Sequence, residues 1–198
     1  LLPNGKIQEA GGIIWDNASG WNYGRADDPS RPQYNYVRET DYVSGAALMI
    51  RRSLWQQLGG FDEAFVPAYY EDTDLCFSAR AASFKVVYQP ASTVVHYEGM
   101  TNGTDLGGGQ KQYQVVNQQR FLEKWQNELA RFHYPNAEQV PRARDRSRDK
   151  RSVLIIDHYV PHYDKDAGSR STWMYIELML DMGWRVQLIG ANFFPHQP

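Results

Sequence analysis

The chain of 198 residues is nearly balanced in charge, with 21 Lys and Arg residues against 23 Asp and Glu residues. This balance excludes a strong overall field that would attract nucleic acid or anionic lipid. Hydrophobic residues make up 42% of the chain, enough for a buried core, and no stretch approaches the roughly 18 apolar residues of a transmembrane segment. The single cysteine, Cys76, excludes an intramolecular disulfide and fits a reducing cytoplasm.

The N-terminal part of the chain combines a short strand with a long loop. Apolar residues predict the strand at 11–15, and the loop runs from Asp16 to Thr40. A loop of this length in a compact domain is usually functional or disordered. Its aromatic residues include Trp21 and Tyr23, and amphipathic rings in a loop often mark recognition. We therefore regard Trp21 and Tyr23 as candidate binding residues.

The next segments alternate between short strands and helices. Small apolar residues at 42–50 predict a buried strand, in which Gly45 permits the close approach of a ligand or another backbone. Ser53 should cap a short helix at 54–58 that stops at Gly59. A second helix is predicted from Thr73 onward, with that residue or the preceding aspartate as its N-cap.

The C-terminal half is expected to contain two different parts joined by a linker. Strands at 85–88 and 92–96 precede a long helix that runs from about residue 112 to residue 132. Prolines and closely spaced charges mark 135–151 as a solvated, charged linker. A strand at 153–157, a helix at 169–182 and a strand at 185–189 then predict one βαβ unit of a second α/β domain.

A cluster of carboxylates marks the start of the second helix. Glu71, Asp72 and Asp74 fall within four residues, directly after Tyr70. Carboxylates at a helix N-terminus stabilise the helix dipole, which is the simplest interpretation of the cluster. The adjacent aromatic residue and the small-residue strand also favour a catalytic site. His96 is either a structural histidine or a contact to a metal ion or phosphate group.

Four blocks in this order carry a resemblance to a known family. They are VSGAALMIRR at 43–52, GGFDEAF at 59–65, YEDTDLCF at 70–77 and VHYEG at 95–99. Together they resemble the C-terminal half of an inverting family 2 glycosyltransferase with a GT-A fold. The resemblance implies transfer of a sugar from a nucleotide-sugar donor to a glycan hydroxyl.

The resemblance also implies roles for individual residues. Asp72 matches the general base of the family, Glu71 matches its companion, and His96 matches a histidine that helps to bind the metal ion and the diphosphate. An acceptor hydroxyl is a poor nucleophile, so a carboxylate must take its proton as it attacks. Gly45 and Tyr70, together with the loop aromatics, are expected to shape the acceptor side of the site. A divalent metal, Mn or Mg, is expected in the full-length enzyme.

These patterns predict a fragment of a multidomain glycosyltransferase. Residues 1–134 are interpreted as the C-terminal part of a GT-A domain with a Rossmann-like mixed sheet, and 135–151 as the linker. Residues 152–198 resemble the N-terminal start of a family 4-like GT-B glycosyltransferase. The nucleotide-binding half is expected outside this chain, so the fragment alone should be inactive.

The expected setting is bacterial surface polysaccharide synthesis, in the cytoplasm or at the inner face of the membrane. Two alternatives remain open. One is a non-catalytic glycan-binding module that uses the exposed aromatic residues. The other is a fragment that is inactive in isolation and self-associates through surfaces that its absent parts would cover.

Overall fold

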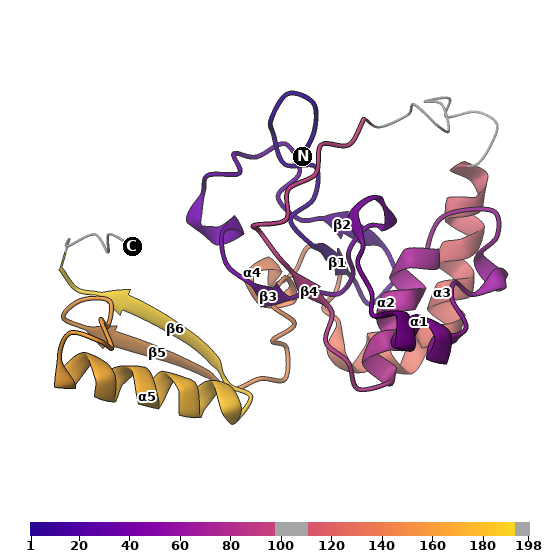
Figure 1. Ribbon diagram of the computed structural model, residues 1–198. Helices are drawn as coiled ribbons and strands as arrows, with labels where there is room; N and C mark the ends of the chain where they lie inside the picture. The colour runs from indigo at the N-terminus through magenta and orange to yellow at the C-terminus, as the bar shows by residue number, and fades with distance from the viewer. Residues whose placement is uncertain (98–110, 193–198) are drawn as a thin grey trace. The chain divides into compact units, whose positions relative to one another are not determined.

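The computed structural model describes residues 1–97 and 111–192 (Figure 1). The chain forms two compact units, 1–148 and 149–198. Both units combine helices with small β-sheets, which confirms the predicted α/β class. Glu98 and Gly99, the end of the fourth family block, lie outside the described residues.

The first unit contains two small antiparallel sheets. Strand β1 (Gly12–Ile14) pairs with β2 (Gly20–Asn22), and β3 (Arg38–Glu39) pairs with β4 (Val87–Tyr88). Strand β1 is buried along its whole length and confirms the strand predicted at 11–15. The expected mixed sheet is not formed by the described residues of this unit, because each of their strands pairs only in the antiparallel sense.

Two predicted strands of the first unit are wrong. Residues 42–50 contain the short 3-10 helix η2 (Gly45–Ala47), because the Ser44 hydroxyl accepts the Ala46 N–H and turns the backbone. Residues 92–96 are exposed and form no strand. Their backbone contacts include a hydrogen bond from the His96 N–H to the Leu1 carbonyl, at 2.9 Å, and one from the Leu1 α-amino group to the Val94 carbonyl, at 2.5 Å.

Three helices build the core of the first unit (Figure 1). They are α1 (Arg52–Leu58), α2 (Glu71–Ala81) and α3 (Lys111–Phe132). The predicted end of α1 at Gly59 is confirmed, since this glycine has a φ of 81° and closes the helix in the left-handed conformation. The long predicted helix is confirmed as α3. The N-cap of α2 is Tyr70, not Asp72 or Thr73 as expected, and Ser53 lies inside α1 instead of capping it.

The apolar face of α2 packs against α3. Phe77 of α2 contacts Phe121 of α3 edge to face, with ring centroids 4.8 Å apart. Both rings are fully buried, and Leu129 is buried in the same cluster. The contact fixes the position of α2, and therefore of the carboxylates at its N-terminus.

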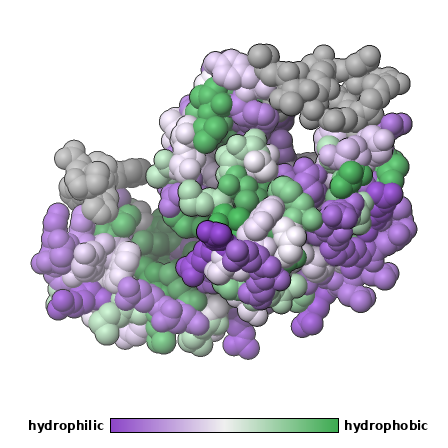
Figure 2. Space-filling view, turned by 45° about the vertical axis from the view of Figure 1, so that its right-hand side comes forward, coloured by the Kyte–Doolittle hydropathy of each residue, from purple (hydrophilic) through white to green (hydrophobic). Residues whose placement is uncertain are grey.

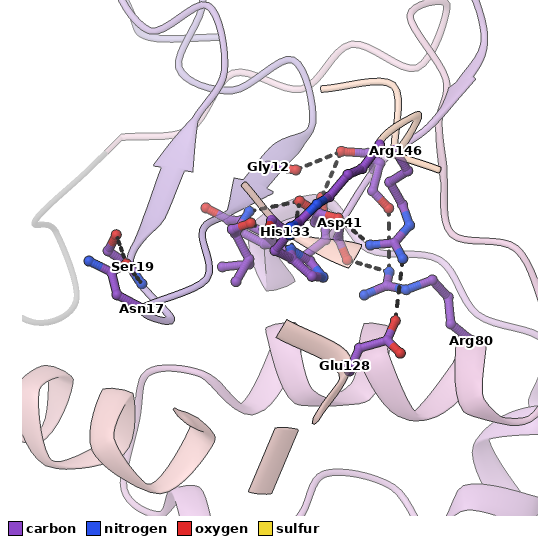
Figure 3. Close-up of polar contacts among 12 residues, drawn as sticks. Gly12, Asn17, Ser19, Asp41, Arg80, Glu128, His133 and Arg146 are labelled. Atoms are coloured by element: carbon purple, nitrogen blue, oxygen red, sulfur yellow. Dashed lines mark hydrogen bonds and ion pairs between the residues drawn. The ribbon is translucent and has the colours of Figure 1, made fainter. Parts of the chain in front are cut away.

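The segment at 135–151 was predicted to be a solvated linker, but its residues 135–148 fold as part of the first unit. It contains the short helix α4 (Val140–Ala143), and its residues up to 148 belong to the first unit. Arg146 pairs with the buried carboxylate of Asp41 and lies 3.4 Å from Glu128 of α3 (Figure 3). A buried carboxylate requires a partner, and the sequence did not reveal that Asp41 is buried. This ion pair is the physical reason that the segment folds back.

The second unit is the predicted βαβ unit. Strand β5 (Ser152–Asp157) pairs in parallel with β6 (Arg185–Gly190), and α5 (Ala167–Asp181) connects them. Many large apolar side chains of this unit remain exposed, including Ile156, and Figure 2 shows hydrophobic residues among hydrophilic ones at the surface. Within the described ranges, no helix has both the length and the apolar character needed to cross a membrane.

We expect Arg146→Ala to lower the free energy of unfolding by about 3 kcal/mol, because it leaves the buried Asp41 carboxylate without its cation. The exposed fractions of these two side chains are 13% and 4%. Urea unfolding followed by tryptophan fluorescence measures the change.

The matched control is Arg31→Ala, which removes a solvent-exposed pair with Asp27, with exposed fractions of 56% and 28%. This control should cost no more than about 1 kcal/mol. Equal effects of the two variants would contradict the structural importance of the Asp41 pair.

Candidate functional site

A cleft of about 1110 Å³ opens in the first unit. Its walls come from the N-terminal segment, from β2 and the turn after it, from the segment before η2, and from the start of α2. Five of the predicted site residues line it: Trp21, Tyr23, Tyr70, Glu71 and Asp72. The fold therefore brings the aromatic loop and the carboxylate cluster to one cavity.

Aromatic rings form one wall of this cleft. Trp21 is 40% exposed and packs edge to face on the fully buried Trp15, at a centroid distance of 5.1 Å. Tyr23 packs on Tyr34 at 5.3 Å, and its hydroxyl accepts a hydrogen bond from Arg144. Rings supported in this way present fixed apolar faces to the cleft.

A strained turn directs the carboxylates into the cleft. Tyr69 and Tyr70 have φ values of 74° and 71°, a conformation that residues with a Cβ rarely adopt. The fully buried Asn117 of α3 holds the turn, since its side-chain amide donates to the carbonyls of Ala68 and Tyr69 at 2.9 and 3.0 Å. The Tyr70 hydroxyl donates to the Ala18 carbonyl at 2.8 Å.

Asp72 is oriented by two backbone amides. Its Oδ2 accepts the N–H of Gly45 at 2.8 Å, and its Oδ1 accepts the N–H of Thr73 at 2.6 Å. Oδ1 also accepts the Thr73 hydroxyl at 3.2 Å. A carboxylate oxygen offers about two acceptor positions, so Oδ2 keeps one position for a ligand.

Gly45 does not line the cleft, but its N–H donates a hydrogen bond to Asp72, which does. A Cβ atom at this position would lie 3.6 Å from the Asp72 side chain, which is ordinary van der Waals contact. The expected close approach is therefore not a steric requirement between these two residues. The contribution of Gly45 is its backbone N–H.

Glu71 is half-buried beside Asp72. Its Oε2 is buried and has no hydrogen-bond partner among the described residues. Burial raises the pKa of Glu71, and the negative charge of Asp72 raises it further. Glu71 therefore retains a proton to higher pH than an exposed glutamate does.

The cleft is also lined by Glu9, a carboxyl group that the sequence interpretation missed. Its Oε1 accepts the N–H of Ser44 at 3.0 Å. Burial raises the pKa of Glu9 from 4.5 to about 7; the Ser44 hydrogen bond opposes this change, and the charge of Asp72 adds to it. No local pattern distinguishes Glu9 in the sequence, because its burial depends on contacts with distant segments.

His96 lies away from these residues. It is exposed, is absent from the residues that line the cleft, and contacts the side-chain amide of Gln8 at 2.9 Å through its Nδ1. Within 1–97 and 111–192, no group of three His, Cys, Asp or Glu side chains could hold a metal ion. We therefore assign no metal ligand among the described residues, and the divalent cation that the resemblance implied stays a prediction.

Comparison with known proteins finds a family model that matches part of the first unit. Residues 22–113 match the model of the family "Glycosyltransferase like family 2". The matched segment contains Tyr23 and the start of α2 with Glu71 and Asp72, and it ends before the second unit begins. This match supports a family 2 glycosyltransferase domain at these residues.

Individual relatives align with part of this chain. The chain is 38% identical over 68 residues to the N-acetylglucosaminyl-diphospho-decaprenol L-rhamnosyltransferase of two Mycobacterium tuberculosis strains. The alignment covers 34% of this chain and 22% of the rhamnosyltransferase. A protein of Sinorhizobium fredii that is described as uncharacterized is 29% identical over 106 residues, which cover 51% of this chain and 12% of that protein. No solved structure matches the chain.

We expect Glu9→Gln to change how the free energy of unfolding depends on pH. The folded-state pKa of Glu9 is above its unfolded value, so the protonated group stabilises the fold fully below pH 4.5, and this stabilisation is lost as pH rises through about 7. A shift of this size corresponds to roughly 3–4 kcal/mol. The glutamine cannot ionise and should not show this loss.

Urea unfolding at about pH 5 and about pH 8 measures the difference between the variant and the unmodified chain. Glu123→Gln is the control, because Glu123 is exposed on α3 and outside the cleft. Parallel pH profiles for Glu9→Gln and the unmodified chain would contradict the burial of Glu9.

Proposed function

We propose that the first unit is the acceptor side of an inverting glycosyltransferase, which transfers a sugar from a nucleotide-sugar donor to a hydroxyl group of a glycan. The observation that carries this proposal is the position of Asp72. Its carboxylate lies in a large cleft, opposite aromatic residues and within the segment that matches the family 2 model. A carboxylate can accept the proton of a sugar hydroxyl, and aromatic rings can pack against a sugar ring.

In this proposal Asp72 is the general base. The acceptor hydroxyl donates its proton to Oδ2, the oxygen with a remaining acceptor position, while the hydroxyl oxygen attacks the anomeric carbon. The nucleoside diphosphate leaves from the opposite face, so the configuration at that carbon is inverted. The amides of Gly45 and Thr73 hold the carboxylate in one orientation during the attack.

The neighbouring residues assist binding. Glu71 lines the cleft beside Asp72 and offers its carboxyl group to the substrate. Trp21, Tyr23 and Tyr70 present their rings to the acceptor sugar. Gly45 acts through its hydrogen bond to the base.

The donor side of the reaction is assigned to parts of a longer protein. The aligned segment covers 22% of the rhamnosyltransferase, whose name describes transfer of L-rhamnose to a lipid-linked diphosphate sugar. We infer a multidomain enzyme of bacterial surface polysaccharide synthesis that acts in the cytoplasm or at the inner membrane face. Its second unit would begin a GT-B-like domain. A Mn or Mg ion would stabilise the leaving diphosphate, and we assign it no ligand among the described residues, His96 included.

Asp72→Asn tests the base. In the longest natural form of the protein, we expect this change to reduce kcat for sugar transfer by about 10²- to 10⁴-fold, because asparagine cannot accept the proton. Radiolabelled donor and a polysaccharide acceptor measure transfer. Glu123→Gln is the matched control, since it makes the same carboxylate-to-amide change outside the cleft.

Two outcomes would contradict this function. Unchanged transfer by Asp72→Asn would remove the proposed base. Glycan binding by the unmodified full-length protein without any transfer would favour the non-catalytic binding module, which could use the same aromatic wall.

Trp21→Ala tests the aromatic wall. Loss of the ring should raise the KM for the acceptor by about 3- to 10-fold with little change in kcat, because a packing contact of this kind contributes about 1 kcal/mol. Trp173→Ala is the control, since Trp173 is 39% exposed and lies on α5 in the second unit. Equal effects of the two changes on KM would show that Trp21 does not contact the acceptor.

A further inference from the structure

Two consecutive backbone amides hold two carboxyl groups in the cleft. The N–H of Ser44 donates to Oε1 of Glu9 at 3.0 Å, and the N–H of Gly45 donates to Oδ2 of Asp72 at 2.8 Å. Adjacent amides lie only a few ångströms apart, so the two carboxyl groups are neighbours although they are distant in the sequence. Glu9 and Asp72 both line the cleft.

The second oxygen of Glu9 is available to a ligand. Oε1 is occupied by the Ser44 amide, while Oε2 makes no hydrogen bond with the residues that the structure describes. Glu9 precedes the residues that match the family 2 model, which begin at Asn22. Neither the family match nor the sequence motifs assign a role to Glu9.

The surroundings of Glu9 favour its neutral form. Burial has the largest effect and raises its pKa to about 7. The charge of Asp72 also raises this pKa, whereas the Ser44 amide and the α-amino group of Leu1 lower it. Tyr42 and Cys76 face the same region, and the charge of Glu9 raises the pKa of each. Both forms of Glu9 are therefore populated near neutral pH.

We propose that Glu9 is a second acceptor-binding residue, whose protonated carboxyl group donates a hydrogen bond from Oε2 to a sugar oxygen beside the hydroxyl that Asp72 deprotonates. This role rests on the proposed function. A neutral carboxyl group can donate to the sugar without placing a second negative charge next to the base. Ionised Glu9 loses the donor and repels Asp72, so acceptor binding should weaken as pH rises.

The expected kinetic signature is a pH-dependent KM for the acceptor. With a pKa near 7, KM should rise about 10-fold between about pH 6 and about pH 8 in the full-length enzyme. Glu9→Gln keeps an oxygen for the Ser44 amide and N–H groups for the sugar, so it should abolish this rise. Glu9→Ala should have a high KM at every pH.

A direct titration provides a readout that requires no activity. The ¹³C NMR signal of the Glu9 side-chain carboxyl, assigned by its loss in Glu9→Gln, should titrate with a pKa of about 7 in this chain. The same pKa should fall in Asp72→Asn, because the neighbouring charge is removed. Titration near 4.5, or no response to Asp72→Asn, would overturn the paired arrangement.

The outcomes separate this inference from the proposed function. Sugar transfer with an acceptor KM that does not depend on pH would overturn the role of Glu9 and leave Asp72 as the base. Absence of transfer at every pH would overturn the function and this role together. Transfer with a pH-dependent KM that persists in Glu9→Gln would assign the dependence to another group and overturn the role of Glu9.

Discussion

The first unit depends on one buried carboxylate, Asp41. Its Oδ2 accepts the Ile14 N–H of β1 at 2.8 Å, and its Oδ1 pairs with Arg146 of the charged C-terminal segment (Figure 3). An isolated buried charge is very costly, so the partners must assemble together. The amides of Ser44 and Gly45, which hold the carboxyl groups of the cleft, follow Asp41 within four residues.

The carboxylates at the start of α2 can both stabilise the helix and take part in chemistry. Glu71 and Asp72 stand where the helix dipole favours negative charge, and they also line the cleft. Two left-handed residues precede them, and the buried Asn117 compensates for this strain with three hydrogen bonds to the turn. The structural interpretation of the carboxylates and the catalytic one are therefore compatible.

The proposal that this unit forms the acceptor side of the site rests on the groups that the cleft contains. The cleft offers carboxyl groups and aromatic rings, which suit a neutral acceptor sugar. Within that proposal, the pairing of Glu9 with Asp72 adds a pH-dependent contact to the acceptor side. The two carboxyl groups then differ in role because burial and hydrogen bonding differ around them.

The sequence by itself determined the elements whose signals are local: the long helix α3, the end of α1 at Gly59 and the βαβ unit, together with the carboxylates that open α2. Helical spacing, a left-handed glycine and apolar runs are properties of neighbouring residues. Only the tertiary structure decided the pairing of Arg146 with Asp41, the hydrogen bond of the Gly45 N–H to Asp72 and the burial of Glu9. These features depend on charges and amides that are distant in the chain, so burial and pKa became definite only after folding.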